Sequence, residues 1–438
     1  MTARYEIIGG KPVVGEIACF GAKNFATKAM VAACLGDAPT ILTNVPPIGD
    51  VAITRNLLES VGVKVESLDA TTLKIDPTGM STFKVSTPDS RSNRIPILLL
   101  PILLHKFGEA MIPRLDGCNI GKRAVDIHEQ AVEAFGGEIE VDEEHLGAKC
   151  VKKLKGTHFA MHYPSVGATE TCLFLSVLAE GESVLTGVAL EPEIMALVGM
   201  LQGMGARIWV GEGRVIRVQG VPRLGGTTWA CIGDRIEAAS WASLACATKG
   251  EIILNGIRPE HLSNFLPFYR QLGGGYDVLG PDKLRFYRDG PLSPIMLETN
   301  AYPGFATDWQ QPFAVLLTQA EGISAIHETV YEARFGYAEM LNKMGARMQV
   351  SDVCIGQPCR FAHRGHAHSA FILGATPLKA LEDPLEVPDL RAGLAYVVAA
   401  AVAEGTTTLT HIERIERGYG PLEKRLDGIL NVRRIAST

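Results

Sequence analysis

A recurring pattern of apolar and polar positions divides the chain into six similar stretches. In each stretch an apolar, helix-like run ends at a glycine, and a short segment rich in β-forming residues follows. Successive glycines of this kind lie 72, 73, 69, 72 and 83 residues apart, at Gly36, Gly108, Gly181, Gly250, Gly322 and Gly405. Self-similarity at a nearly fixed spacing indicates an internal repeat.

Each stretch then continues into a second helix-like pattern that closes on another glycine. This second glycine follows the first by 23 to 28 residues, as in Gly250 to Gly273, and another short apolar segment comes after it. The order is typical of a strand, a helix ended by a left-handed glycine, and a further strand. We therefore expect six βαβ-containing units of about 72 residues, grouped into two domains of three.

Composition and charge narrow the class of protein. The chain has 438 residues, of which 47% are apolar, so it can bury large cores and is too apolar to be disordered. Its net charge of -6 and the absence of a Lys/Arg-rich block argue against a nucleic-acid partner. The longest apolar runs, 95–104 and 392–403, are too short to cross about 30 Å of hydrocarbon. The opening residues lack the apolar core of a signal peptide, so we expect a cytoplasmic protein with reduced cysteines and no membrane partner.

Several short motifs carry candidate chemistry. Between Gly117 and Gly121 the chain places Cys118, five residues before Arg123, in a stretch with no apolar run long enough for a strand. Near the beginning of the chain, Lys23 lies where a β-rich segment leads into a helix. Backbone amides at a helix N-terminus together with a lysine can bind phosphate or carboxylate, although a solvated lysine at an ordinary helix start is the alternative.

Two acidic residues, Asp308 and Asp389, precede helical runs, where helix capping is the alternative to a functional role. Arg417 lies beside Gly418 in the last repeat.

Eight motifs together resemble one family, the UDP-N-acetylglucosamine enolpyruvyl transferases. They occur in the same order and span nearly the whole chain: Lys23-Asn24, the Gly-Cys-x-Ile-Gly-x-Arg-x-Val-Asp-x-His loop of 117–128, and the segments 165–169, 234–237, 307–308, 332–335, 389–392 and 417–419. The resemblance implies transfer of enolpyruvyl from phosphoenolpyruvate to the 3-hydroxyl of UDP-N-acetylglucosamine, the first committed step of peptidoglycan precursor synthesis, with no cofactor. It also implies an α/β fold, a two-domain inside-out α/β barrel, in which residues 1–22 and 233–438 form the first domain. Residues 23–232 would form the second, which carries the cysteine loop.

The same resemblance assigns roles to individual residues. The reaction needs an acid that protonates C3 of phosphoenolpyruvate and a base that accepts the proton of the attacking hydroxyl. A thiol with an ordinary pKa of about 8.5 is mostly protonated at neutral pH, so Cys118 would be the acid and Asp308 the base. Lys23, Arg123 and Arg417 would surround phosphoenolpyruvate, because its two anionic groups need several cations. The substrate-binding set would consist of Asn24, Arg94 (with Arg91 as the alternative), Arg123, Ala124, Val125, Asp126, Ile127, Ser165, Val166, Gly167, Val330, Asp389 and Arg391.

The chain departs from the family pattern at places that bear on the acceptor substrate. Tyr163 and Pro164 stand where the family often has a lysine two residues before the serine of the 165–169 motif. Asn119 and Ala124 also differ from the residues common in the cysteine loop. Two alternatives therefore remain open: transfer to another nucleotide or sugar hydroxyl such as that of UMP, and a non-catalytic paralogue that binds a nucleotide sugar. A 5-enolpyruvylshikimate-3-phosphate synthase fits poorly, because its acid is not a cysteine loop of this kind.

The longest repeat interval contains an additional segment rich in cysteine and histidine. It holds Cys354, Cys359, His363, His366 and His368, residue types that zinc prefers. Because the spacing matches no recognised zinc finger, we favour an ordered polar excursion, and we expect no metal. Three other cysteines, Cys34, Cys172 and Cys246, lie in apolar helical runs and are expected to be small buried hydrophobic residues. The sequence leaves the oligomeric state open.

Overall fold

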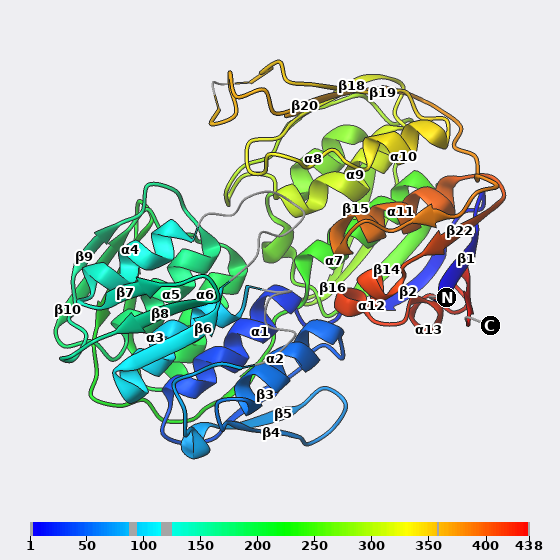
Figure 1. Cartoon of the computed structure of the whole chain (residues 1–438). Helices are drawn as coiled ribbons and strands as arrows, with labels where there is room; N and C mark the ends of the chain where they lie inside the picture. The colour runs from blue at the N-terminus through cyan, green and yellow to red at the C-terminus, as the bar shows by residue number, and fades with distance from the viewer. Residues whose placement is uncertain (1–2, 87–93, 115–124, 357–358, 437–438) are drawn as a thin grey trace. The chain divides into compact units, whose positions relative to one another are not determined.

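The computed structural model describes residues 3–86, 94–114, 125–356 and 359–436, and it divides into two compact units (Figure 1). Unit 1 consists of Met1–Phe20 and Gly233–Thr438, and unit 2 consists of Gly21–Ile232. Among the residues described, no helix combines the length and the hydropathy needed to cross a bilayer.

Unit 2 contains three copies of one order of elements. A buried helix leads into a strand, a more exposed helix follows, and a β-hairpin closes the copy. The helices are α1 (Lys23–Ala32), α2 (Gly49–Glu59), α3 (Pro96–Phe107), α4 (Asp126–Ala134), α5 (Val166–Ser176) and α6 (Pro192–Gly203). The strands are β3 (Thr40–Thr43), β4 (Lys64–Ser67), β5 (Leu73–Asp76), β6 (Glu109–Pro113), β7 (Glu138–Val141), β8 (His145–Lys149), β9 (His158–Ala160), β10 (Glu182–Thr186), β11 (Arg207–Gly211), β12 (Val215–Gln219) and β13 (Thr228–Ala230).

Unit 1 repeats the same order. Its helices are α7 (Arg235–Ala247), α8 (Leu266–Leu272), α9 (Gln310–Leu317), α10 (Ala338–Lys343), α11 (Leu390–Val402), α12 (Glu413–Tyr419) and α13 (Leu422–Arg425), with a short 3-10 turn η5 (Thr307–Trp309) before α9. Its strands are β1 (Arg4–Ile8), β2 (Val14–Ala18), β14 (Glu251–Asn255), β15 (Gly274–Gly280), β16 (Lys283–Arg288), β17 (Met296–Glu298), β18 (Gly322–His327), β19 (Met348–Ser351), β20 (Ser369–Gly374), β21 (Leu385–Glu386), β22 (Thr406–Thr410) and β23 (Asn431–Ile435).

The small sheets share one topology. In the described chain, a parallel edge strand pairs with the strand that opens the repeat, and the two hairpin strands follow, giving β13-β3-β5-β4, β9-β10-β12-β11, β2-β14-β16-β15 and β17-β18-β20-β19. The sheet β6-β8-β7 has an isolated parallel bridge in place of the edge strand. In the sixth sheet, β21-β22-β1-β23, strand β1 takes the place of a hairpin strand.

The second glycine of every repeat follows the last residue of a helix by one to three positions. Positive φ angles between 71° and 110° occur at Gly62, Gly136, Gly205, Gly273, Gly345 and Gly428. L-residues with a Cβ rarely adopt this conformation, so glycine allows the chain to turn from the helix into the next strand. The strand, helix, glycine and strand read from the sequence are therefore confirmed. The sequence pattern did not reveal the parallel edge strands.

The core of each unit is built around the helices that precede the first glycines. Every residue of α7 and α9 is buried, and α11 packs against both. In unit 2, α1 and α5 both contact α3, whose first nine residues are buried. Strands such as β14 alternate buried and more exposed positions, which is the pattern of a sheet with one face on a core. The result is a two-domain α/β fold with the apolar helices innermost (Figure 1). The closed inside-out barrel stays a prediction.

Candidate functional site

Asp308 forms the centre of a charged cluster in unit 1. It lies on η5, directly before α9, and its two carboxylate oxygens contact two arginines: Oδ1 lies 2.5 Å from an Nη atom of Arg334 and Oδ2 lies 3.2 Å from Nε of Arg391. Both arginine side chains are buried, whereas the Asp308 side chain is 23% exposed. Two guanidinium groups therefore neutralise and orient a carboxylate that solvent or a substrate can still reach.

The N-termini of the three buried helices of unit 1 are linked by these contacts. Arg391 belongs to the first turn of α11, and Trp309 of η5 donates a 3.1 Å hydrogen bond from its indole to the carbonyl of Arg235 at the start of α7. The Arg235 guanidinium also lies over the Trp309 ring, 5.2 Å from its centroid. Helix N-termini carry partial positive charge, so this end of unit 1 favours anionic groups.

Helix α12 holds Arg391 in place. The Tyr419 hydroxyl lies 2.6 Å from an Nη atom of Arg391. A Cβ at Gly418 would lie 2.4 Å from a side-chain carbon of Leu390, so a glycine allows α12 to approach the start of α11 this closely. Burial alone would lower the pKa of Arg391, but Asp308 and Tyr419 raise it above its usual value. Arg417 lies on the same helix, directly before Gly418, and is partly exposed.

Asp389 caps α11. One of its carboxylate oxygens accepts hydrogen bonds from the backbone amides of Arg391, at 2.7 Å, and Ala392, at 3.0 Å. Asp234 caps α7 in the same way. Capping was the alternative considered for Asp389, and the structure confirms it. A substrate contact of Asp389 stays a prediction.

A buried carboxylate, Glu328, connects Asp308 with the loop that carries Val330. Glu328 is fully buried and accepts hydrogen bonds from the hydroxyl of Thr307 at 2.9 Å and from the amides of Val330 at 2.6 Å and Tyr331 at 2.9 Å. Burial raises its pKa, and the hydrogen bonds and Arg334 oppose that change. Val330, a predicted substrate contact, is therefore held by its backbone, with its side chain partly exposed.

In unit 2, the predicted residues also lie in or next to the first turns of the buried helices. Lys23 and Asn24 open α1, and the Lys23 ammonium lies 3.0 Å from a carboxylate oxygen of Asp50 at the start of α2. Both side chains of this pair are largely buried. The helix start expected at Lys23 is thus confirmed, and the lysine is not a solvated surface group.

One buried histidine of α4, His128, contacts α5. Its Nδ1 lies 2.8 Å from the hydroxyl of Thr171 on α5, and a Cβ at Gly167 would lie 3.3 Å from its ring. Burial, followed by the positive charge of Arg94, lowers the pKa of His128 to about 3, so its ring is neutral at pH 7. Arg94 itself lies just before α3.

The remaining predicted residues of unit 2 lie at helix starts or outside the described chain. Ser165 caps α5, because its hydroxyl accepts a 3.3 Å hydrogen bond from the Ala168 amide, and Val166 begins that helix. Val125, Asp126 and Ile127 lie at the start of α4. Cys118, Arg123 and Ala124, together with Asn119 and the alternative Arg91, lie outside the described residues.

Sequence reasoning did not assign roles to Arg334, Glu328 and His128. Arg334 and His128 both occur inside motifs that carried the resemblance, so a signal for them was present. Glu328 had no such signal. Its role depends on contacts with Thr307 and Gln310, which precede it by 21 and 18 residues.

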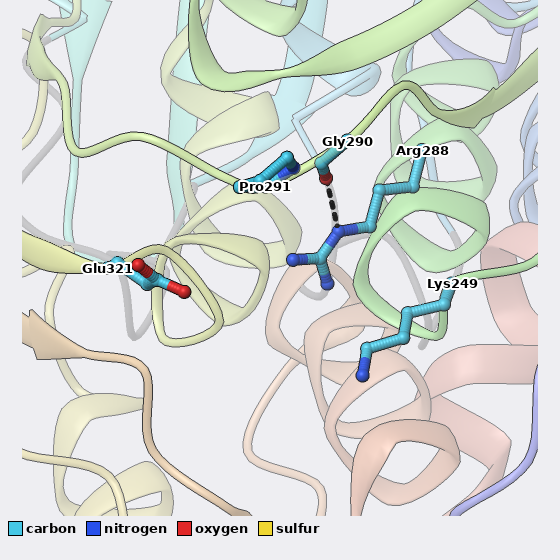
Figure 2. A pocket seen from close by; sticks show the side chains of 5 residues that line it. All are labelled: Lys249, Arg288, Gly290, Pro291 and Glu321. Carbon is cyan, nitrogen blue, oxygen red and sulfur yellow. Dashed lines mark hydrogen bonds between the residues drawn. The ribbon is translucent and has the colours of Figure 1, made fainter.

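A shallow pocket of unit 1 is lined by none of the predicted site residues. Lys249, Arg288, Gly290, Pro291 and Glu321 surround it, and the Arg288 guanidinium donates a 2.8 Å hydrogen bond to the carbonyl of Gly290 (Figure 2). Two cations, Lys249 and Arg288, and one carboxylate, Glu321, line this pocket, so its charge is mixed.

Comparisons with known proteins agree with the motifs and the fold. Residues 7–426 match the family model described as EPSP synthase (3-phosphoshikimate 1-carboxyvinyltransferase). The UDP-N-acetylglucosamine 1-carboxyvinyltransferase of Protochlamydia amoebophila is 43% identical over 94% of this chain and 90% of its own length, and that of Chlamydia pneumoniae is 41% identical over 94% and 91%.

Solved structures support the fold. The enolpyruvyl transferase NikO from Streptomyces tendae superposes with a TM-score of 0.88 at 21% identity, covering all of both chains, and an EPSP synthase from Acinetobacter baumannii with 0.74 at 18%, covering 99% and 100%. The chain therefore belongs to the EPSP synthase family of enolpyruvyl transferases and, within it, to the UDP-N-acetylglucosamine 1-carboxyvinyltransferases.

Proposed function

We propose that this chain transfers the enolpyruvyl group of phosphoenolpyruvate to the 3-hydroxyl of UDP-N-acetylglucosamine and releases phosphate, a step toward peptidoglycan precursors. The observation that carries the proposal is Asp308, a partly exposed carboxylate oriented by two buried arginines among the N-termini of three buried helices. The names of the relatives at 40–43% identity supply the substrates. We expect the reaction to take place in the cytoplasm.

The reaction requires two proton transfers, one from an acid and one to a base. Protonation of C3 makes C2 of phosphoenolpyruvate electrophilic, and the sugar oxygen then bonds to C2 as it loses its proton. The resulting tetrahedral intermediate loses phosphate and one C3 proton, which restores the double bond. In this proposal the Cys118 thiol delivers the C3 proton and Asp308 accepts the hydroxyl proton.

Cations stabilise the anionic donor substrate. Lys23, Arg123 and Arg417 are assigned to its phosphate and carboxylate, and charge-assisted hydrogen bonds suit both groups.

The affinity for the acceptor substrate should depend on Tyr163 and Pro164, which stand where the family often has a lysine. Loss of one lysine contact to a diphosphate corresponds to about 1.5–3 kcal/mol, or about tenfold to hundredfold in affinity. We therefore expect UDP-N-acetylglucosamine to be the preferred acceptor, with a raised KM. Phosphate release with UDP-N-acetylglucosamine, UMP and other uridine sugars measures this preference. A higher kcat/KM for UMP would instead favour the alternative of nucleotide modification, and no release with any acceptor would favour the non-catalytic paralogue.

The assigned acid is tested by Cys118→Ser. A hydroxyl is a much weaker acid than a thiol, so turnover should fall by about 10²–10⁴-fold, the usual contribution of general acid catalysis. Binding of the nucleotide sugar, measured by calorimetry, should persist. Cys150→Ser, at a partly buried free cysteine of unit 2, is the matched control and should keep wild-type turnover. Near-normal rates for Cys118→Ser would show that the thiol is not the acid.

A further inference from the structure

Two cysteines and two histidines form a compact cluster in unit 1. His327 ends β18, His368 directly precedes β20, and Cys354 and Cys359 come from the additional segment between β19 and β20. One ligand atom from each of the four residues lies within 4.8 Å of all the others. The thiol sulfur of Cys354 lies 3.4 Å from Nε2 of His327. In a tetrahedral zinc site, Zn–S bonds of about 2.3 Å and Zn–N bonds of about 2.0 Å place sulfur and nitrogen about 3.5 Å apart.

Both imidazole rings are oriented as metal ligands usually are. Nδ1 of His327 lies 2.8 Å from a carboxylate oxygen of Glu298, and Nδ1 of His368 lies 2.7 Å from the carbonyl of His366. These contacts favour a proton on Nδ1 and leave the lone pair of each Nε2 for a metal ion. Nε2 of His368 is buried and makes no hydrogen bond of ordinary geometry within the described chain, although the Cys354 thiol is close enough to interact with it.

The backbone of the additional segment fits closely over this cluster. A Cβ at Gly356 would lie 2.3 Å from Nδ1 of His327 and 2.4 Å from the Glu298 carboxylate, so the segment can pass there only with a glycine. Phe361 is buried, and its ring centroid lies 6.2 Å from that of His368. The two histidines that remain, His363 and His366, are exposed and do not belong to the cluster.

We propose that His327, Cys354, Cys359 and His368 bind one structural zinc ion. Two sulfurs and two imidazole nitrogens are a donor set that suits zinc, and four protein ligands leave no open position for a substrate. A disulfide between Cys354 and Cys359 would use both sulfurs but would leave two buried imidazole nitrogens without a partner. A metal ion accounts for all four groups together. This site replaces the polar excursion that we favoured from the sequence.

The ion would stabilise the loop next to the candidate active site. His327 is followed by Glu328, whose amide donates a 2.7 Å hydrogen bond to the carbonyl of His368. The Glu328 carboxylate in turn holds the amides of Val330 and Tyr331. On the other side, the Arg360 side chain donates a hydrogen bond to the carbonyl of Val330. Zinc would therefore stabilise the two hydrogen bonds that hold the backbone of Val330, one with Glu328 and one with Arg360.

The metal content of the purified full chain tests the site. Protein produced with zinc in the medium should contain close to one equivalent by mass spectrometry of the metal. Cys354→Ser and Cys359→Ser should each lose most of it, whereas His363→Ala, at an exposed histidine of the same segment, should retain it. Undiminished zinc in the two cysteine variants would overturn the assignment, and iron in place of zinc would overturn the choice of metal.

A second measurement uses only the wild-type chain and does not depend on whether a variant folds. Removal of the metal by a chelator, followed by addition of Co²⁺ under reducing conditions, should give the visible absorption of tetrahedral cobalt with thiolate ligands. Hydrogen exchange of the Val330 and Tyr331 amides should accelerate in the metal-free protein, and exchange in α5 of unit 2 should not change. Absence of both zinc and cobalt uptake would refute the site, and unchanged exchange at Val330 would refute its connection to the loop.

Discussion

The stability of unit 2 should depend on pH through one buried carboxylic acid, Glu170. It lies on α5 with an exposed fraction of 2%. Burial is the main cause that raises its pKa from its usual 4.5 to about 7. Lys28 opposes the change, while Glu193 and Glu191 add to it. Ionised Glu170 is therefore unfavourable in the folded protein.

The sign and size of the effect follow from proton linkage. Because the pKa is higher in the folded protein, the contribution of Glu170 to stability is fully present below pH 4.5 and is lost as the pH rises through 7. A change from 4.5 to about 7, at about 1.4 kcal/mol per pKa unit, gives a destabilisation of about 3 kcal/mol at pH 8 and about 1 kcal/mol at pH 5. Glu170→Gln mimics the protonated acid in shape and cannot ionise. It should therefore be more stable than the wild type by these amounts.

Urea unfolding followed by circular dichroism at pH 5, 6.5 and 8 measures the difference in free energy of unfolding between the variant and the wild type. Glu59→Gln, at an exposed position of α2, is the matched control and should give a difference near zero at each pH. A Glu170→Gln difference that stays constant from pH 5 to pH 8 would show that this carboxylate does not titrate in the folded protein, and the reasoning would be wrong.

Two further predictions concern the N-termini of the buried helices of unit 1. Tyr419→Phe removes the hydroxyl that contacts Arg391 at 2.6 Å. We therefore expect a loss of about 1–2 kcal/mol in stability, measured by thermal unfolding, and a lower kcat for phosphate release. Unchanged values for both would contradict the positioning role of Tyr419. Asp234→Ala removes the cap that accepts hydrogen bonds from the amides of Ile236 and Glu237, and should cost about 1–2 kcal/mol, whereas Asp234→Ser should restore most of the stability; equal losses in the two variants would argue against capping.

Local signals in the sequence predicted much of the fold. The second glycines, such as Gly273 and Gly345, follow helices and have a positive φ, which a glycine placed directly after a helical pattern predicts. The parallel edge strands left no such signal. Strand β13, for example, pairs with β3 from Ile41 to Thr43, and a pairing across that much of the chain has no periodic counterpart in the sequence.

The sequence predicted those residues of the candidate site that lie at the start of a helix. Lys23, Ser165 and Arg391 all lie in or next to the first turn of a buried helix, which the change from polar to apolar residues reveals. The residues that contact them from elsewhere in the chain were harder to predict from the sequence. The cysteine- and histidine-rich segment gave no sign of His327, which precedes Cys354 by 27 residues and lies 3.4 Å from it in the fold, where β18 pairs with β20.

Strand β1 determines the order in which the chain can fold during synthesis. Unit 2 is one continuous segment, so it can fold once Ile232 has left the ribosome. Strand β1 is made before the other strands of the described residues, but its partners are β22 and β23, so that Tyr5 pairs with Leu409 and Arg434. Synthesis adds about 5–20 residues per second, so β1 stays without its partner strands for tens of seconds after unit 2 can fold. During that time the backbone groups of β1 are unpaired and can associate with other strands.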